Sequence, residues 1–335
     1  MDHGGSVDER RRRAGSPTAI RDVPPGVSPA PRVILLLDLD STAIRVSQAR
    51  IVPGVAFHVD REEPIPVRPA DGRPDLPASA VRDTIKAVRL FLQDLRAEGD
   101  VRVWIVATAA IREASGRARL LDPLGREEGV EVRVVSEGEE GRLGAIAARG
   151  SLPDPQALVA DLGDTSLQLT RIQEGKIRPV ARVPLGAAQT TRRFVKHHLP
   201  TPAEARALRR EVRQHVGPVM PGLGGDAGVV GLGGYAQALG RLHLRAIWDR
   251  RVCLHGLRLQ LGDVAAIRER LEGLLSPRRG KVNGPAAQRG KTLLAAAMVF
   301  EELMALGGCP ALTVCVHGAG YGLLIAETFG EASQP

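Results

Sequence analysis

The sequence predicts an α/β protein of two domains, each with a mixed sheet, around a shared cleft. The chain has 335 residues, which is long enough for two separately buried cores. At residues 38–42 and again at residues 161–166, an apolar segment ends at an aspartate and a turn of small polar residues. Such a turn presents backbone N–H groups, hydroxyls and a carboxylate, which suit a phosphate and its metal ion. Two of them predict two half-domains that close on one phosphate-bearing ligand.

The composition is that of a globular protein, with 43% hydrophobic and 25% charged residues. Aromatic residues make up only 3%, which argues against a nucleic-acid platform built on base stacking. The net charge of +8 favours polyanionic ligands, although an arginine-rich composition explains it equally well. The three cysteines form no CxxC pair, and no apolar stretch reaches the roughly 18 residues of a membrane span. We therefore expect a cytoplasmic protein that does not bind membranes.

The N-terminal segment, residues 1–31, is predicted to be a disordered tail because it is rich in arginine and proline and has little to bury. The first domain, residues 32–150, begins with a strand, a turn and two further strands, and a loop is expected from Pro64 to Pro77. Apolar residues spaced by three and four predict the helix that follows. The predicted strands are 33–37, 44–47, 54–59, 101–107 and 130–135, and the predicted helices are 78–98, 111–120 and 139–148.

The second domain, residues 151–335, repeats this order. It also opens with a strand, a turn and two strands, and it continues with helices that cross a sheet. The predicted strands are 158–162, 167–173, 180–183, 229–232 and 311–316, and the predicted helices begin near 187 and cover 203–216, 262–275 and 286–306, with further helices after 234 and at the C-terminus. The sequence therefore predicts an internal duplication of architecture without one of sequence.

Six short blocks of the chain resemble, in order, the exopolyphosphatase/guanosine pentaphosphate phosphatase (Ppx–GppA) family. The blocks are residues 38–43, 106–114, 136–142, 161–168, 183–187 and 229–235. The resemblance covers about residues 33–330 and implies two actin-like domains of the ribonuclease H-like, actin, hexokinase and Hsp70 superfamily.

The resemblance also implies a chemistry, which is Mg²⁺-assisted attack of water on the terminal phosphoanhydride of inorganic polyphosphate or guanosine pentaphosphate. Glu139 is expected to be the catalytic carboxylate, with Gln168 beside the attacking water. Asp38 and Asp161 are expected to place the metal. The expected phosphate-binding residues are Ser41, Thr42, Arg112, Gly163, Thr165, Ser166, Gly233 and Gly234.

The chain departs from the family pattern at the site itself. Asp40 and Asp164 stand where glycines are usual, Gln168 replaces a glutamate, and Tyr235 replaces a threonine. A carboxylate beside a phosphate is repulsive, and an amide cannot take a proton from water. These changes leave open an additional bound Mg²⁺, weakened catalysis, or ordinary activity. They also leave open a sensor that binds polyphosphate or a nucleotide without hydrolysing it.

A second interpretation of the first turn is a haloacid dehalogenase-like phosphatase, in which Asp38 attacks phosphorus and Asp40 is the general acid. That family also needs a late pair of acidic residues, and Asp164 has no second acid close after it. The blocks at residues 136–142 and 231–235 would then be unexplained. A homodimer is left open as the assembly.

Overall fold

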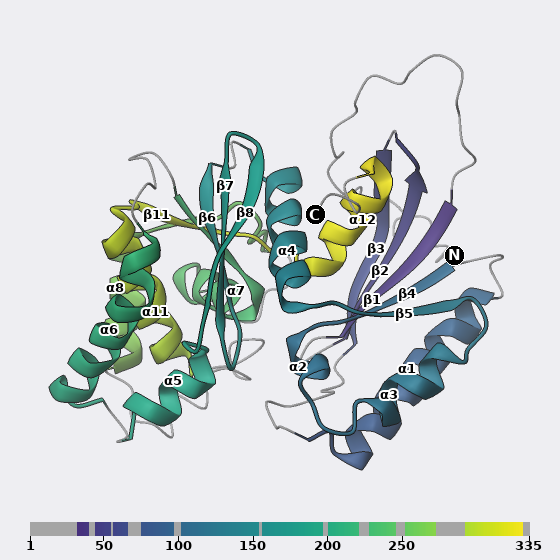
Figure 1. Ribbon diagram of the computed structural model, residues 1–335, viewed down its shortest axis with the longest axis horizontal. Helices are drawn as coiled ribbons and strands as arrows, with labels where there is room; N and C mark the ends of the chain where they lie inside the picture. The colour runs from purple at the N-terminus through teal and green to yellow at the C-terminus, as the bar shows by residue number, and fades with distance from the viewer. Residues whose placement is uncertain are drawn as a thin grey trace, which may run out of the picture.

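The computed structural model describes most of the chain as two sheets with helices between and around them (Figure 1). The described residues are 32–39, 44–54, 56–65, 75–96, 102–153, 156–196, 200–220, 228–245, 252–272 and 292–330. The predicted tail and three residues of the first turn, Asp40, Ser41 and Thr42, lie outside them. Within these ranges no helix is long and apolar enough to cross a lipid bilayer.

The first sheet has the strand order β3-β2-β1-β4-β5. Its strands are β1 (Arg32–Leu39), β2 (Ile44–Val52), β3 (Ala56–Ile65), β4 (Arg102–Ala107) and β5 (Val130–Val134). The first three strands are antiparallel, whereas β4 and β5 run parallel to β1. The loop expected from Pro64 begins later, because β3 continues to Ile65 and Pro64 pairs with Arg45. An edge strand tolerates proline, which lacks the N–H donor that a central strand needs.

The second sheet repeats the arrangement of the first. Its order is β10-β11-β9-β6-β7-β8, with strands β6 (Ala157–Leu162), β7 (Leu167–Gln173), β8 (Lys176–Val183), β9 (Gly228–Leu232), β10 (Arg258–Gln260) and β11 (Ala311–Val314). Strands β6, β7 and β8 are antiparallel, and β9 and β11 follow parallel to β6. The predicted duplication of architecture is thus confirmed. The short edge strand β10 was not predicted from the sequence.

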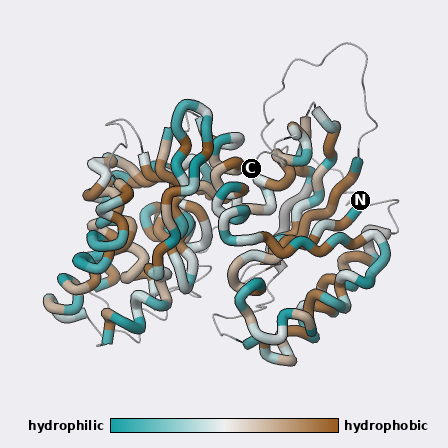
Figure 2. Tube along the Cα trace, viewed as in Figure 1, coloured by the Kyte–Doolittle hydropathy of each residue, from teal (hydrophilic) through white to brown (hydrophobic). Residues whose placement is uncertain are grey.

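Helices cover both sheets, and we call each sheet with its covering helices a domain. They are α1 (Ala78–Arg96), α2 (Ala109–Arg112), α3 (Ala118–Gly125), α4 (Glu137–Ser151), α5 (Ala187–Phe194), α6 (Pro202–Val216), α7 (Gly233–His243), α8 (Leu261–Glu272), α11 (Leu293–Gly307) and α12 (Ala319–Phe329). α1 and α3 bury the outer face of the first sheet, and α6, α7, α8 and α11 bury that of the second. Hydrophobic residues concentrate along the central strands of the first sheet (Figure 2).

Two helices, α4 and α12, lie between the sheets and pack against each other (Figure 1). α4 contributes Ala145 and Ala148 to a core with β6 and β9 of the second sheet. α12 belongs by sequence to the predicted second domain, but its Leu323 packs against β1 of the first sheet. Gly322 lies so close to the backbone of Leu143 that a Cβ there would overlap it. The two helices therefore fix how the domains meet.

Strand alternation decides where the predicted site residues point. On β1, residues 35, 37 and 39 pack toward α1 and α3, whereas residues 34 and 36 pack toward α12. By the same alternation, Asp38 lies on the face of β1 that carries residues 34 and 36, toward α12. On β6, residues 158, 160 and 162 face the outer helices and residues 157 and 159 face α4, so Asp161 points toward α4. Both aspartates therefore face the space between the domains.

The closeness of α4 and α12 predicts that Gly322→Ala destabilises the protein. The added methyl group would meet backbone, which cannot move as a side chain can, so we expect a loss of about 3 kcal/mol in the free energy of unfolding, at the upper end of the usual cost of overpacking. Gly138→Ala is the matched control on α4, because nothing lies within 4 Å of its added Cβ. Urea unfolding measures both variants. A Gly322→Ala protein as stable as the control would contradict the tight crossing.

Candidate active site at the domain junction

The start of α4 carries two consecutive glutamates that point in different directions. Ser136 caps the helix and accepts a hydrogen bond from the Glu139 N–H at 3.3 Å. The Glu139 side chain is partly exposed and lies 3.0 Å from the guanidinium of Arg133 on β5. Glu140 shares the buried face of the helix with Leu143, and only 8% of it is exposed. It is therefore Glu140, and not Glu139, that enters the junction between the domains.

Glu140 is held by groups from both domains. Its Oε2 lies 2.7 Å from Nη1 of Arg112, which also donates to the carbonyl of Val135 at 2.8 Å. Its Oε1 accepts from the backbone N–H of Ala109 at 3.4 Å, at the start of α2. The side chain of Gln168 on β7, which is also buried, hydrogen-bonds to the same carboxylate. Arg112, Glu140 and Gln168 thus form one buried polar group.

Burial raises the pKa of Glu140 above its ordinary value of 4.5. The cause is the loss of hydration of the charged form, and it outweighs the opposing effects of Arg112, Ala109 and Gln168. A carboxylate with a raised pKa is a better proton acceptor than an exposed one, provided that it is ionised at the working pH. Glu140 has the environment that a general base requires.

The second turn is tied to the start of α5. The Gly163 N–H donates to the carbonyl of Ser166 at 2.9 Å, and the Ala187 N–H donates to the carbonyl of Gly163 at 2.9 Å. The backbone of Gly186 lies so close to Thr165 that a Cβ would overlap it. Thr165 is exposed and Ser166 is buried. The turn is therefore held against the start of α5, with Thr165 exposed at its tip.

Asp164 and Tyr235, two of the departures from the family pattern, contact each other. The Tyr235 hydroxyl donates to Oδ1 of Asp164 at 2.6 Å and lies 2.7 Å from Oγ1 of Thr292. Tyr235 is otherwise buried, with 1% of its surface exposed. A hydroxyl that donates to a carboxylate stabilises its charge. The carboxylate of Asp164 in the second turn is thus stabilised by the hydroxyl of Tyr235.

Asp161 lies beside the start of α7. Oδ1 of Asp161 is 3.1 Å from where a Cβ on Gly233 would be, and Gly233 has a φ of +80°. The positive φ favours glycine at this position, because L side chains rarely adopt that backbone conformation, and a Cβ would also press on the carboxylate of Asp161. The glycine brings the N-terminus of α7 close to the carboxylate. Gly234 follows in the first turn of the same helix.

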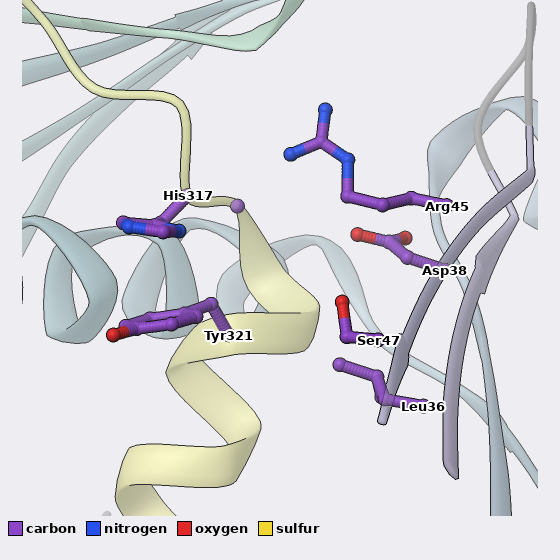
Figure 3. Close-up of a pocket in the computed structure, with 7 residues that line it drawn as sticks. Leu36, Asp38, Arg45, Ser47, His317 and Tyr321 are labelled. Atoms are coloured by element: carbon purple, nitrogen blue, oxygen red, sulfur yellow. The ribbon is translucent and has the colours of Figure 1, made fainter. Parts of the chain in front are cut away.

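Asp38 lines a small pocket between the first sheet and the start of α12 (Figure 3). It stands directly opposite Arg45 in the ladder of β1 and β2, and Arg45 donates to the carbonyl of Val316 at 2.6 Å. His317 stacks on Tyr321 with 3.8 Å between ring centroids. Burial lowers the pKa of His317 to about 3, so its imidazole is neutral at physiological pH. The pocket is lined by Leu36, Asp38, Arg45, Ser47, His317, Gly318 and Tyr321.

Asp38 and Asp161 are the two carboxylates predicted to place a magnesium ion. No group of three or more His, Cys, Asp and Glu side chains in the described part of the chain could hold a metal. Mg²⁺ is, however, commonly held by one or two carboxylates, with waters and substrate phosphates completing the shell. The segment that follows β11 contacts both sheets, because Arg45 of β2 donates to the carbonyl of Val316 at 2.6 Å and the Cys315 N–H donates to the carbonyl of Gly231 on β9 at 3.0 Å. Asp38 and Asp161, which both face the space between the domains, would suit this role.

Several predicted residues meet in the structure, and others do not. Arg112 and Gln168 are together in the polar group at the junction, whereas Glu139 is directed away to Arg133. Ser41 and Thr42 lie outside the described residues. Sequence reasoning missed Glu140, although the helical period that places it on the same face as Leu143 and Gly144 was a usable signal.

Comparison with known proteins identifies the family. The model of the Ppx/GppA phosphatase family matches residues 70–327. The chain belongs to the Ppx/GppA phosphatase family. The predicted resemblance is thereby confirmed, and the haloacid dehalogenase-like interpretation has no support. The match covers the polar group of Arg112, Glu140 and Gln168 and the whole second sheet.

Solved structures of Ppx/GppA proteins share this fold. An Aquifex aeolicus PPX-GPPA enzyme has a TM-score of 0.79 at 24% sequence identity, covering 89% of this chain and 100% of the other. An exopolyphosphatase from Cytophaga hutchinsonii has a TM-score of 0.75 at 19% identity, covering 89% of this chain and 98% of the other. At these identities the likeness concerns the fold.

The contact between Tyr235 and Asp164 predicts that Tyr235→Phe lowers stability by about 1.5–3 kcal/mol, the usual cost of losing a hydrogen bond to a charged group. Asp164→Asn and the double variant complete a double-mutant cycle, measured by urea unfolding. We expect the double variant to be clearly more stable than the sum of the single losses implies. Strict additivity would show that the hydroxyl and the carboxylate do not interact.

Proposed function

We propose that this Ppx/GppA protein hydrolyses the terminal phosphoanhydride of inorganic polyphosphate or guanosine pentaphosphate, with water as the attacking group. The observation that carries the proposal is the buried Glu140, which is held between Arg112 of the first domain and Gln168 of the second. A raised pKa and a fixed orientation are what a general base for water requires. Because Glu139 points away to Arg133, we assign this role to Glu140.

In the proposed reaction, Glu140 accepts a proton from water as the oxygen attacks the terminal phosphorus. Gln168 donates to the carboxylate and holds its orientation, and as an amide it takes no proton. Arg112 offers positive charge to the phosphate through Nη2, which donates no hydrogen bond within the described residues. Positioning and charge stabilisation supply most of the rate enhancement in phosphoryl transfer.

The remaining predicted residues have roles in binding. Asp38 and Asp161 would hold Mg²⁺, which when bound neutralises charge on the transferred phosphoryl group. Backbone N–H groups at Thr165 and Ser166, and those at the start of α7, would contact phosphate oxygens, whereas the N–H of Gly163 is already bonded to the carbonyl of Ser166. The carboxylate of Asp164 opposes this binding unless a cation accompanies the phosphate. We therefore expect weaker phosphate binding at low Mg²⁺ than a turn without Asp164 would give.

A sensor that binds the same ligands without turnover is the second candidate. The observation that favours it is that Arg112 is engaged by Glu140 and that Gln168, which hydrogen-bonds to Glu140, is an amide where the family pattern has a glutamate. A phosphate-release assay and a binding assay on one sample separate the two functions. Release supports the phosphatase, and binding without release supports the sensor.

The two glutamates of α4 allow a direct test of the general base. Glu140→Gln removes the proton acceptor, so we expect phosphate release to fall by about 10²–10⁴-fold while tripolyphosphate still binds. Glu139→Gln, one residue away on the same helix, is the matched control and should retain most of the activity. Malachite-green detection of released phosphate measures both. If Glu139→Gln lost phosphate release and Glu140→Gln retained it, the general base would be Glu139.

The raised pKa of Glu140 also predicts two opposite dependences on pH. Activity should fall as pH decreases through this pKa, because the base must be ionised to take a proton. The free energy of unfolding should instead decrease as pH rises from about 4.5 through the raised value, because the folded protein binds this proton more tightly than the unfolded chain does. Glu140→Gln should lack this stability change. A parent whose stability is flat over this window would contradict the burial argument.

A further inference from the structure

A network of ion pairs joins the polar group at the domain junction to the edge strand of the second sheet. Its five side chains alternate in charge and are, in order, Glu140, Arg112, Glu113, Arg182 and Glu137. Arg112 is 2.7 Å from Glu140 and 3.5 Å from Glu113. Arg182 on β8 is 2.7 Å from Glu113 and 2.8 Å from Glu137. Each nitrogen of the Arg182 fork thus contacts a different carboxylate. Arginine can make two such contacts because its guanidinium is planar and presents several donors in fixed directions.

Arg182 and Glu113 come from different domains. Arg182 lies on the edge strand of the second sheet, whereas Glu113 directly follows α2 of the first domain. The backbone segments that carry them are joined elsewhere through α4. The ion pair therefore exists only when the two domains are as close together as they are here.

Glu113 lies between the two arginines, and both contact the same oxygen. Oε1 of Glu113 is 2.7 Å from Nη2 of Arg182 and 3.5 Å from Nη2 of Arg112. The closer arginine therefore has the hydrogen bond, while Nη2 of Arg112 is buried without one. The side chain of Arg182 is 35% exposed and that of Arg112 is 13% exposed. A carboxylate so near to Arg112 would bind it if Arg182 were absent.

We propose that Arg182 is a positioning residue that holds Glu113 away from Arg112 when the domains close. This inference rests on the proposed function, in which Nη2 of Arg112 contacts a phosphate. When the domains separate, Glu113 loses Arg182, pairs with Arg112 and competes with the phosphate. When they close, Arg182 takes Glu113, and the guanidinium of Arg112 becomes available to the ligand. Domain closure and ligand affinity are thereby coupled through one carboxylate.

Binding of tripolyphosphate, measured by isothermal titration calorimetry, tests the proposal. Arg182→Ala should weaken binding by roughly three- to tenfold, because the released carboxylate competes for Arg112. Adding Glu113→Gln should restore the affinity to within about twofold of the parent, since the competing charge is gone. Arg182→Lys should be intermediate, because one ammonium replaces a two-pronged fork. Arg178→Ala, which removes another exposed arginine of β8, is the matched control and should leave binding unchanged.

Restored binding in the Arg182→Ala, Glu113→Gln double variant would show that Arg182 acts by holding Glu113 away from Arg112. If Arg182 contacted the ligand itself, or only joined the domains, the double variant would remain as weak as Arg182→Ala, and the proposal would be wrong. A crystal structure of the Arg182→Ala protein tests the proposal without a ligand.

In that structure Glu113 should lie within hydrogen-bonding distance of Nη2 of Arg112, and a Glu113 carboxylate that stays away from Arg112 overturns the proposal. Absence of tripolyphosphate binding by the parent would contradict the proposed function, and this structure would still decide the role of Arg182.

Discussion

The crossing of α4 and α12 is the constraint on which the rest of the structure depends. Each helix covers the inner face of one sheet, and a glycine at the crossing lets their backbones meet. Because interiors pack without voids, this contact sets the spacing of the two sheets. The N-terminus of α4 then carries Glu140 to Arg112 of the first domain and Gln168 of the second. A site shared by two domains needs such a contact between them, because neither domain supplies all of its groups.

A buried carboxylate is costly unless charges and donors satisfy it. At Glu140 the compensation is incomplete, since desolvation still outweighs the combined effects of its partners on its pKa. That imbalance is chemically useful, because a carboxylate satisfied in full would be a poor proton acceptor. The same charges extend outward through Arg112 and Glu113 to Arg182. The proposed general base and the contact between the domains thus belong to one network of charges.

Two of the residues that depart from the family pattern, Asp164 and Tyr235, contact each other in the structure. Asp164 introduces a charge into the second turn, and Tyr235, far along the chain, donates a hydrogen bond to it. A turn with an acid in place of glycine would otherwise repel itself and its ligand. The pairing explains how the fold accommodates the acid, and it makes the second turn of this chain chemically different from one lined by glycine. Ligand preference should follow from that difference.

The sequence by itself determined the duplicated α/β architecture, because strand and helix periods and the aspartate turns are local patterns. It also predicted that Asp38 and Asp161 end two such strands, whereas the direction of their side chains follows from alternation along β1 and β6 in the structure. It misjudged the end of β3, where an edge position tolerates Pro64, and it did not distinguish the buried Glu140 from the partly exposed Glu139. Which glutamate is buried, which carboxylate Arg182 contacts, and what Tyr235 donates to depend on the packing of elements distant in the chain. Only the tertiary structure decides such contacts, since burial and desolvation arise when the two domains meet.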